Sequence, residues 1–262
     1  MITETLVART GTTMIREEKS RGELVSVIMP AYNLEHIIPL SILRVREILE
    51  KHGYNYEIIV IDDGSKDNTY QEALRVSRVD PERIKVYKLP RNKGKGYALI
   101  YGYKHSRGDI IVFFDADLDI DPNQIPLLIE TLRSNGSDTV VTSKWHPRSR
   151  TKARLTRWFL SRAFYALAKL FLGINLRDTQ TGAKAFKRYV LDNVVRELLV
   201  KRYAFDLELL TLASNYGFNI SEVPALYEIK LNGRFKVREI IRMLIDLLAI
   251  AYRHRLRRLF ER

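Results

Sequence analysis

Near-continuous apolar runs rich in β-branched residues alternate along the chain with longer, helix-like stretches of mixed apolar and polar residues. Such runs, bounded by polar and turn-forming residues, are typical of buried strands. The predicted strands are 24–30, 56–63, 83–89, 109–117 and 137–143. The predicted helices are 36–51, 67–79, 95–106 and 122–134. This alternation predicts an α/β fold, in which a mostly parallel sheet is covered by helices on both faces.

Polar residues gather where three of the predicted strands end. The clusters are "PAYN" at 30–33, "DDGSKDNT" at 62–69 and "DADLD" at 115–119. Ligands of parallel sheets sit beyond the carboxyl ends of the strands, so these clusters predict a binding site. Taken singly, "PAYN" also suits a simple strand exit and turn, and "DDGSKDNT" suits a turn with Asp67 as the cap of the next helix.

The cluster at 115–119 has the composition of a metal site. Asp115, Asp117 and Asp119 follow the apolar run "DIIVFF", and carboxylates this close repel one another unless a positive partner is present. Hard divalent cations bind such carboxylates and take further ligands from water and substrate phosphates. We therefore expect Asp115 and Asp117 to hold Mg²⁺ or Mn²⁺, which would stabilise negative charge on a leaving diphosphate. Asp121, directly before Pro122, is expected to cap a helix and not to bind the metal.

The segment "RNKGKG" at 91–96 lies just ahead of a predicted helix and contains Lys93 and Lys95. Backbone N–H groups at such a helix start can cradle a phosphate. The spacing is not that of a Walker A loop, and an ordinary helix start explains the segment equally well.

Composition removes several classes of function. The 262 residues include no cysteine, which excludes disulfides, zinc–thiolate sites and thiol nucleophiles. The five histidines show neither H-x-H nor HExxH spacing, so no catalytic histidine is proposed. The formal net charge of +13 predicts an anionic partner, which can be a nucleic acid, a membrane surface or a phosphorylated substrate. No RNP-type aromatic motif or zinc-finger spacing supports nucleic acid.

Two stretches near the middle and the end of the chain are basic and amphipathic. They cover 152–172 and 237–260, and charges interrupt both too often for a membrane span. Their aromatic and basic residues favour helices that lie in the headgroup region of a membrane, although both stretches could simply pack on the domain. We divide the chain into a lead-in at 1–22, a main domain at 23–236 and a basic amphipathic helix at 237–262.

Four segments carry a family resemblance. The stretches "VSVIMPAYN", "IIVIDDGSKDNT", "NKGKGYALIYGYKHSRGDIIVFFDADLD" and "RDTQTGAKAFKR" resemble family 2 glycosyltransferases of the GT-A fold, whose Rossmann-like sheet is flanked by helices. The resemblance runs from about residue 24 to about residue 256. Within the family, the chain is most similar to enzymes that load a sugar onto dolichyl or polyprenyl phosphate. "RDTQTGAKAF" followed by "RYAFDLELL" favours the glucosyltransferases, while the mannosyltransferases share the same framework.

The resemblance implies roles for individual residues. Pro30, Ala31 and Tyr32 would line the nucleotide base, and Asp63 would contact the base or ribose. Asp115 and Asp117 match the metal-binding pair, with Asp119 at the position of a third polar ligand in some relatives. The whole set implied to bind the nucleotide sugar is Pro30, Ala31, Tyr32, Glu35, Asp63, Lys93, Lys95, Asp115 and Ala116.

The chain departs from the family pattern at two positions. Relatives commonly have Glu directly after "PAYN", where this chain has Leu34 followed by Glu35. Lys144 stands where many relatives have Arg, which keeps the charge but removes bidentate phosphate binding.

These observations predict a metal-dependent inverting glycosyltransferase that moves a hexose from UDP-glucose or GDP-mannose to dolichyl or polyprenyl phosphate. The residues expected to hold the acceptor phosphate are Lys144, Arg148, Arg177, Arg234 and Lys236. The alternative is transfer to a sugar or protein hydroxyl, for which Asp178 in the acceptor-side "DTQTG" segment would be the catalytic base. A nucleic-acid-binding protein is a weaker alternative. We expect a cytoplasmic protein, without a nucleic-acid partner, that associates peripherally with the anionic cytoplasmic face of a membrane.

Overall fold

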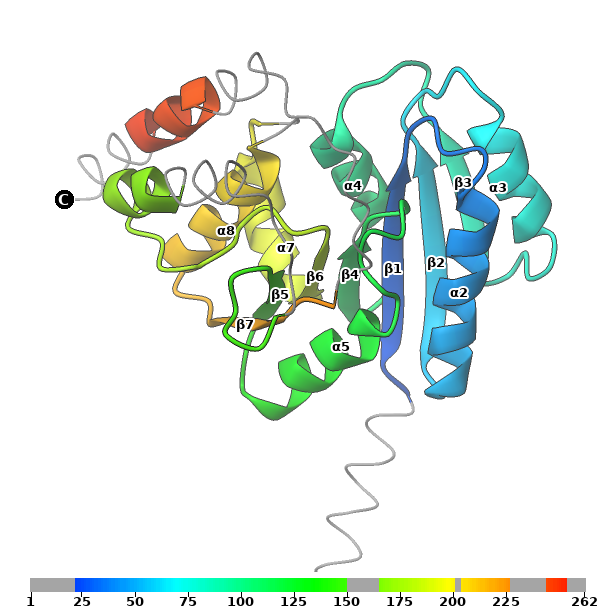
Figure 1. Cartoon of the computed structure of the whole chain (residues 1–262), viewed down its shortest axis with the longest axis horizontal. Coiled ribbons are helices and arrows are strands. Elements are labelled where there is room, and N and C mark those ends of the chain that lie inside the picture. Colours follow the sequence, from blue (N-terminus) through cyan, green and yellow to red (C-terminus); the bar gives the residue numbers. More distant parts are fainter. Residues whose placement is uncertain (1–21, 150–164, 201–203, 227–243, 254–262) are drawn as a thin grey trace, which may run out of the picture.

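A computed structural model describes residues 22–149, 165–200, 204–226 and 244–253 (Figure 1). Seven strands form one sheet with the order β3-β2-β1-β4-β6-β5-β7. They are β1 (Leu24–Ala31), β2 (Asn55–Asp62), β3 (Ile84–Lys88), β4 (Ile110–Phe114), β5 (Thr139–Ser143), β6 (Ala183–Lys187) and β7 (Ile220–Pro224). Only β6 runs antiparallel to its two neighbours, β4 and β5. The predicted mostly parallel α/β sheet is confirmed, and β6 and β7 are strands that the sequence reading missed.

Helices cover both faces of the sheet, as predicted. Their bounds are α2 (Ile38–Lys51), α3 (Thr69–Ser77), α4 (Lys95–Lys104), α5 (Gln124–Ser134), α7 (Arg188–Val194) and α8 (Phe205–Asn215), with a short 3₁₀ helix η1 (Val195–Glu197). The apolar sides of α2, α3 and α5 share one core with one face of the sheet. A second core on the other face contains residues of α4, α7 and α8 and of two further helices, at 165–172 and 244–253.

The ends of β1, β2 and β4 lie level at one edge of the sheet. In the parallel register Ala31 is paired with Asp62, and Ile28 is paired with Phe113. Beyond the last pair, the N–H of Asp63 donates to the carbonyl of Ala31 at 2.8 Å. The three polar clusters of the sequence are therefore neighbours in space, which is the arrangement that a site at a strand edge requires.

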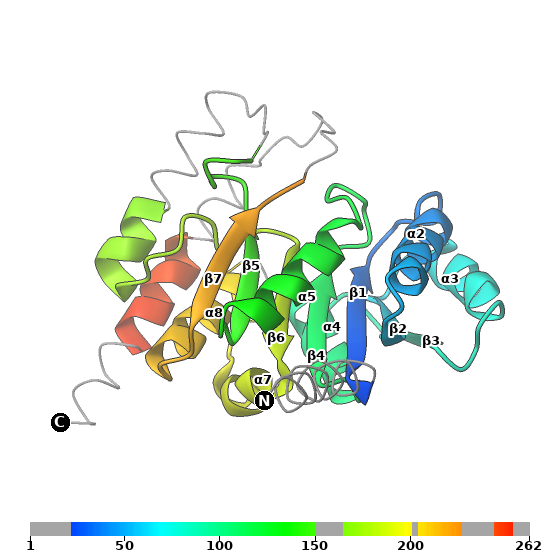
Figure 2. The same cartoon turned by 90° about the horizontal axis from the view of Figure 1, so that it is seen from below.

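The helices at 165–172 and 244–253 lie together at one end of the molecule, next to α8 (Figures 1 and 2). Leu247 and Ile250 are buried in the second core. The large apolar side chains exposed on these two helices are Leu170, Phe171, Ile245, Leu248 and Tyr252. The rest of both predicted amphipathic stretches, 152–164, 237–243 and 254–260, lies outside the described residues. In the described part of the chain, no helix has the length and apolar character needed to span a membrane.

Candidate active site

The loops after β1 and β2 are joined by hydrogen bonds. The N–H of Leu34 donates to Oγ1 of Thr69 at 2.7 Å, and the N–H of Asn68 donates to Oε2 of Glu35 at 2.9 Å. Asp67 accepts bonds from the N–H and the hydroxyl of Thr69 at 3.0 and 2.5 Å. The carboxylate of Glu35 thus supports the start of α3. Its predicted contact with the nucleotide would have to be made in addition to this bond.

Asp63 fastens the loop at 91–94 to the end of β2. Its two carboxylate oxygens accept the N–H groups of Lys93 and Gly94 at 2.7 and 2.8 Å. Gly64 has a φ of +68°, and a Cβ there would lie 2.5 Å from the main-chain carbon of Arg91, so a side chain would push the two loops apart. These two amides already donate to Asp63, so a phosphate cradle at this segment, which stays a prediction, would have to use other N–H groups.

The "DADLD" turn leaves β4 in a strained conformation. The N–H of Asp119 donates to Oδ1 of Asp117 at 3.0 Å, and Leu118 between them has a φ of +58°. The left-handed region costs a non-glycine residue about 1–2 kcal/mol, and burial of the Leu118 side chain holds it there. β4 ends ahead of this turn at Phe114, three residues before the predicted end.

Asp115 is held between the turn and the start of α4. The Nζ atom of Lys95 lies 2.7 Å from each of its carboxylate oxygens. A Cβ on Gly182 would come within 2.3 Å of the same carboxylate, so only glycine allows this approach. Burial raises the pKa of Asp115. The negative charge of Asp117 raises it further, and the positive charge of Lys95 lowers it without reversing the shift. Burial alone would lower the pKa of Lys95, but Asp115 and Asp206 outweigh it and the pKa is raised.

Asp115 and Asp117 suit a divalent cation that shares its coordination with a substrate. Both offer hard oxygen donors from one turn, and their charges interact. Among the described residues, no three Asp, Glu or His side chains gather into a complete metal cage. A cation here would therefore need ligands from a bound diphosphate and from water. Asp119 as a third ligand stays a prediction.

Asp178 connects two loops that follow β5 and precede β6. Its two oxygens accept the N–H groups of Lys144 and Gln180 at 3.1 and 3.0 Å. Glu222 on β7, which the sequence reading missed, accepts the N–H groups of Arg177 and Asp178 at 2.8 and 3.2 Å. Burial raises the pKa of Glu222. These contacts give Asp178 a positioning role, and its role as a base stays a prediction.

Positive charges gather around this loop. Burial and the guanidinium groups of Arg177 and Arg148 lower the pKa of His146, which places all three side chains within electrostatic range. The main-chain N–H of Arg148 donates to Nδ1 of His146 at 3.2 Å. The main-chain N–H of Lys144 donates to Asp178, the residue that follows Arg177. Arg234 and Lys236 lie outside the described residues. His146 belongs to this cluster, although its lone position in the sequence gave no sign of it.

The chain matches the sequence profile of glycosyl transferase family 2 over residues 26–195, which covers the loops at the strand ends and the "DTQTG" segment. The chain belongs to this family.

Relatives within family 2 include dolichyl-phosphate β-glucosyltransferases. The chain is 31% identical to ALG5A of Trichomonas vaginalis over 88% of this chain and 74% of that protein. It is 34% identical to the enzyme of Drosophila melanogaster over 79% of this chain and 67% of that protein. It is also 34% identical to glycosyltransferase AglD of Haloferax volcanii, of which it spans only 36%.

Solved structures show the same fold. The glucosyl-3-phosphoglycerate synthase of Mycobacterium tuberculosis, in a complex with Mn²⁺, UDP-glucose and phosphoglyceric acid, has a TM-score of 0.64 and 23% identity over 89% of this chain and 80% of that one. The mannosyl-3-phosphoglycerate synthase of Rubrobacter xylanophilus has a TM-score of 0.69 and 19% identity over 94% of this chain and 78% of that one. The predicted GT-A fold and the predicted enzyme class, a glycosyltransferase, are confirmed.

Behind the site of this family 2 glycosyltransferase lies a buried ion pair. Nζ of Lys184 on β6 is 2.8 Å from Oδ1 of Asp206 in the first turn of α8, and it also donates to the carbonyl of Thr181. Lys184 is 1% exposed and Asp206 is 6% exposed. Burial lowers the pKa of Lys184 in spite of Asp206. The sequence offered a signal for this pair, since each charge interrupts an apolar run, in "GAKAF" and in "AFDLELL".

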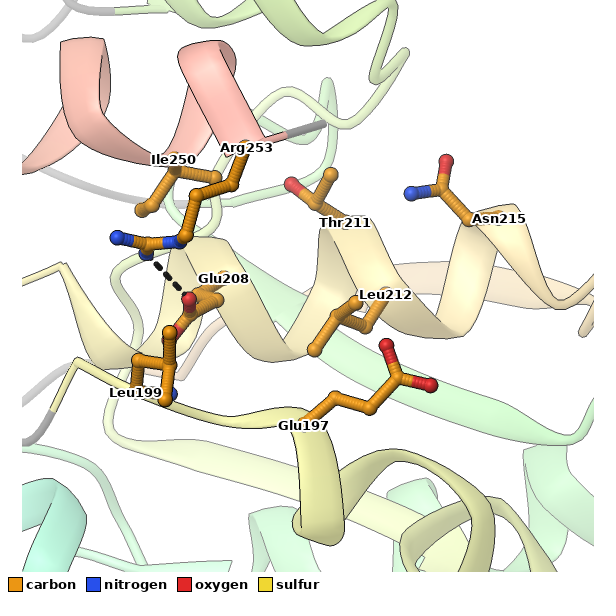
Figure 3. Close-up of a pocket in the computed structure, with 8 residues that line it drawn as sticks. All are labelled: Glu197, Leu199, Glu208, Thr211, Leu212, Asn215, Ile250 and Arg253. Atoms are coloured by element: carbon orange, nitrogen blue, oxygen red, sulfur yellow. Dashed lines mark hydrogen bonds and ion pairs between the residues drawn. The ribbon is translucent and has the colours of Figure 1, made fainter. Parts of the chain in front are cut away.

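A pocket separates the helix at 244–253 from α8 (Figure 3). Arg253 lies 2.5 Å from Glu208, whose other oxygen accepts the N–H groups of Leu199 and Val200 at 3.0 and 2.7 Å. The pocket is lined by Glu197, Leu199, Glu208, Thr211, Leu212, Asn215, Ile250 and Arg253. This ion pair fastens the helix at 244–253 to the domain.

Proposed function

We propose that this glycosyltransferase moves a hexose from UDP-glucose or GDP-mannose to dolichyl or polyprenyl phosphate, to give a lipid-phosphate-linked sugar. Lys144 and Arg177 carry the proposal, because Asp178 accepts the main-chain N–H of Lys144 and so holds the two cationic residues on adjoining loops, where they can bind one anion together. Relatives at 31% and 34% identity that are named dolichyl-phosphate β-glucosyltransferases support the choice of acceptor.

The donor half of the proposed site is the edge formed by β1, β2 and β4. Tyr32, which is 40% exposed at the end of β1, is available to stack on the base. Asp115 and Asp117 would hold Mg²⁺ or Mn²⁺, and a neighbouring structure with Mn²⁺ and UDP-glucose supports this assignment. Such a cation, when bound, supplies charge neutralisation for the leaving diphosphate.

In the acceptor half of the proposed site, transfer depends on how the acceptor phosphate is positioned more than on proton transfer. A lipid phosphate monoester is largely ionised near neutral pH, because its second pKa is about 6. Its oxygen can attack the sugar carbon without a general base, provided that Lys144, Arg148 and Arg177 hold it in line. Asp178, with one N–H bond on each oxygen, would position this loop.

The test of the proposed function is a matrix of donors and acceptors. UDP-glucose and GDP-mannose are each offered with polyprenyl phosphate and with the matched free polyprenol, and radiolabelled lipid product is measured. We expect transfer to the phosphate from one of the donors and at least about 100-fold less transfer to the alcohol, because the alcohol lacks the charge that positions it. Equal turnover of the two acceptors would refute the proposal and would favour the hydroxyl acceptor, with Asp178 as base.

We further propose that the two helices beside α8 bring the site to the cytoplasmic face of a membrane. The exposed apolar side chains of these helices and the net charge of +13 support an anionic lipid surface. The double variant Ile245→Ser/Leu248→Ser is expected to bind anionic liposomes at least tenfold more weakly, since each buried side chain of this size contributes about 1.5–3 kcal/mol.

A liposome flotation assay measures this loss. Val79→Ser serves as the control, because Val79 is 59% exposed just after α3 and lies outside the two helices. Raising the salt concentration should weaken binding of the unmodified protein, since exposed charges are screened. If the double variant floats as well as the unmodified protein, these helices only pack on the domain.

A filter-binding assay with RNA tests the nucleic-acid alternative, for which we expect no binding above that of an equally basic control protein.

A further inference from the structure

The ammonium group of Lys95 contacts the carboxylate of Asp115, which we propose as a metal ligand. Its Nζ atom lies 2.7 Å from each oxygen of Asp115, so both oxygens already have a cationic partner. Mg²⁺ binds carboxylate oxygens at about 2.0–2.1 Å and demands a regular octahedral arrangement. A divalent cation on Asp115 would thus meet the Lys95 charge at short range, in a partly buried site where charges are poorly screened.

Packing of the first turn of α4 fixes the backbone at Lys95, and a second carboxylate interacts with its charge. A Cβ on Gly96 would lie 2.4 Å from the ring of Phe205, so the first turn of α4 packs directly on the first turn of α8. Asp206 follows Phe205, and its carboxylate interacts with the charge of Lys95. Asp206 is itself held by Lys184 at 2.8 Å. The positive charge of Lys95 is therefore stabilised by two carboxylates, that of Asp115 through direct contact and that of Asp206 through its charge.

We propose that Lys95 is a built-in counter-ion of Asp115, which it must leave before a divalent cation can bind, so that metal and donor bind together. The inference rests on the proposed metal site at Asp115 and Asp117. In the absence of the donor, the dication would add two positive charges beside Lys95. The donor diphosphate supplies the negative charge that lets Lys95 turn from Asp115 toward the phosphates, while Asp206 limits the cost of the move. Lys95 thus keeps the carboxylate of Asp115 neutralised until a donor is bound.

The experiment measures Mn²⁺ binding to the whole chain by electron paramagnetic resonance, alone, with UDP and with GDP. The unmodified protein is expected to bind Mn²⁺ weakly alone and at least about tenfold more tightly with one of the two nucleotides at saturation, which is a typical coupling between linked sites. Lys95→Gln is expected to bind Mn²⁺ alone at least about tenfold more tightly than the unmodified protein. Lys104→Gln is the matched control, because it removes the same charge from an exposed position at the other end of α4 and should leave Mn²⁺ affinity unchanged.

Lys95→Arg is a second variant, which keeps the proposal testable if Lys95→Gln does not fold. Lys95→Arg keeps the charge and can bind both oxygens of Asp115 in a fork, so its affinity for Mn²⁺ alone should be no higher than that of the unmodified protein. Unchanged or weaker Mn²⁺ binding by Lys95→Gln would overturn the proposal. Absence of Mn²⁺ binding in every protein, with UDP and with GDP, would overturn it together with the metal site. The donor and acceptor matrix, repeated in EDTA, shows separately whether the proposed transfer reaction still stands.

Discussion

Replacing Asp117 with Asn is expected to lower glycosyl transfer by about a hundred- to a thousand-fold while the fold stays intact. The Asn side chain keeps an oxygen that can accept the N–H of Asp119, so the strained turn at Leu118 is preserved. What is lost is one negative charge at the proposed metal site. Initial rates with the preferred donor and polyprenyl phosphate measure the effect, and circular dichroism checks the fold.

Asp121→Asn is the matched control for this variant. Asp121 lies on the same segment, and its Oδ1 accepts the N–H of Asn123 at 2.8 Å. Because α5 begins at Gln124, Asp121 supports the turn ahead of the helix and does not occupy the cap position itself, which is held by Asn123. Asn at 121 should keep most of the activity. Full activity of Asp117→Asn, or full activity of the unmodified protein in excess EDTA, would contradict the metal site.

Replacing Lys184 with Met is expected to lower the free energy of unfolding by about 3–5 kcal/mol, because it leaves the carboxylate of Asp206 buried without its partner. Urea denaturation followed by circular dichroism measures this change. Lys187→Met on the same strand is the control, since Lys187 has a 34% exposed side chain and pairs with Asp138 at 3.3 Å. An ion pair exposed to this degree contributes about 0–1 kcal/mol.

The double variant Lys184→Met/Asp206→Leu separates stability from function. Replacing both members of a buried ion pair by apolar residues of similar size is often neutral, so the double variant should regain most of the stability that Lys184→Met loses. Its transfer activity should fall below that of the unmodified protein in spite of the regained stability, because the second carboxylate that interacts with the charge of Lys95 is removed. A cost below about 1 kcal/mol for Lys184→Met would show that the pair is not a structural element of the core.

Strong local patterns made the first half of the fold predictable. Five near-continuous apolar runs correspond to β1–β5, and the polar clusters after β1, β2 and β4 lie at one edge of the sheet. β6 was missed because "AKAFK" contains two lysines in five residues, and one of them, Lys184, is buried by a partner 22 residues away. β7, "ISEVP", is too short and polar to be recognised without its neighbour β5.

The sequence predicted that the polar clusters gather at one edge of the sheet, but it did not predict their hydrogen bonds. Asp63 was expected to face the nucleotide, yet its two oxygens bind the amides of a loop 30 and 31 residues further along the chain. Lys95 was expected near phosphate, yet it lies on Asp115. Such pairings depend on which loops the sheet brings together, and no local sequence signal encodes them. The alternation of carboxylates at 115–119 was informative because their mutual repulsion requires a cation, whether lysine or metal.

The antiparallel direction of β6 has a consequence for how this protein can diversify. Thr142, near the end of β5, donates its hydroxyl to the carbonyl of Ala183, the first residue of β6, at 3.0 Å. The segment between these strands thus leaves the sheet and returns to it at adjacent points, and it contains Lys144, Arg148, Arg177 and Asp178. Lengthening such an excursion costs little, since closure entropy grows only with the logarithm of loop length. If this segment binds the acceptor, as we propose, we expect that its length and sequence can change without disturbing the ends of β1, β2 and β4, where the donor is proposed to bind.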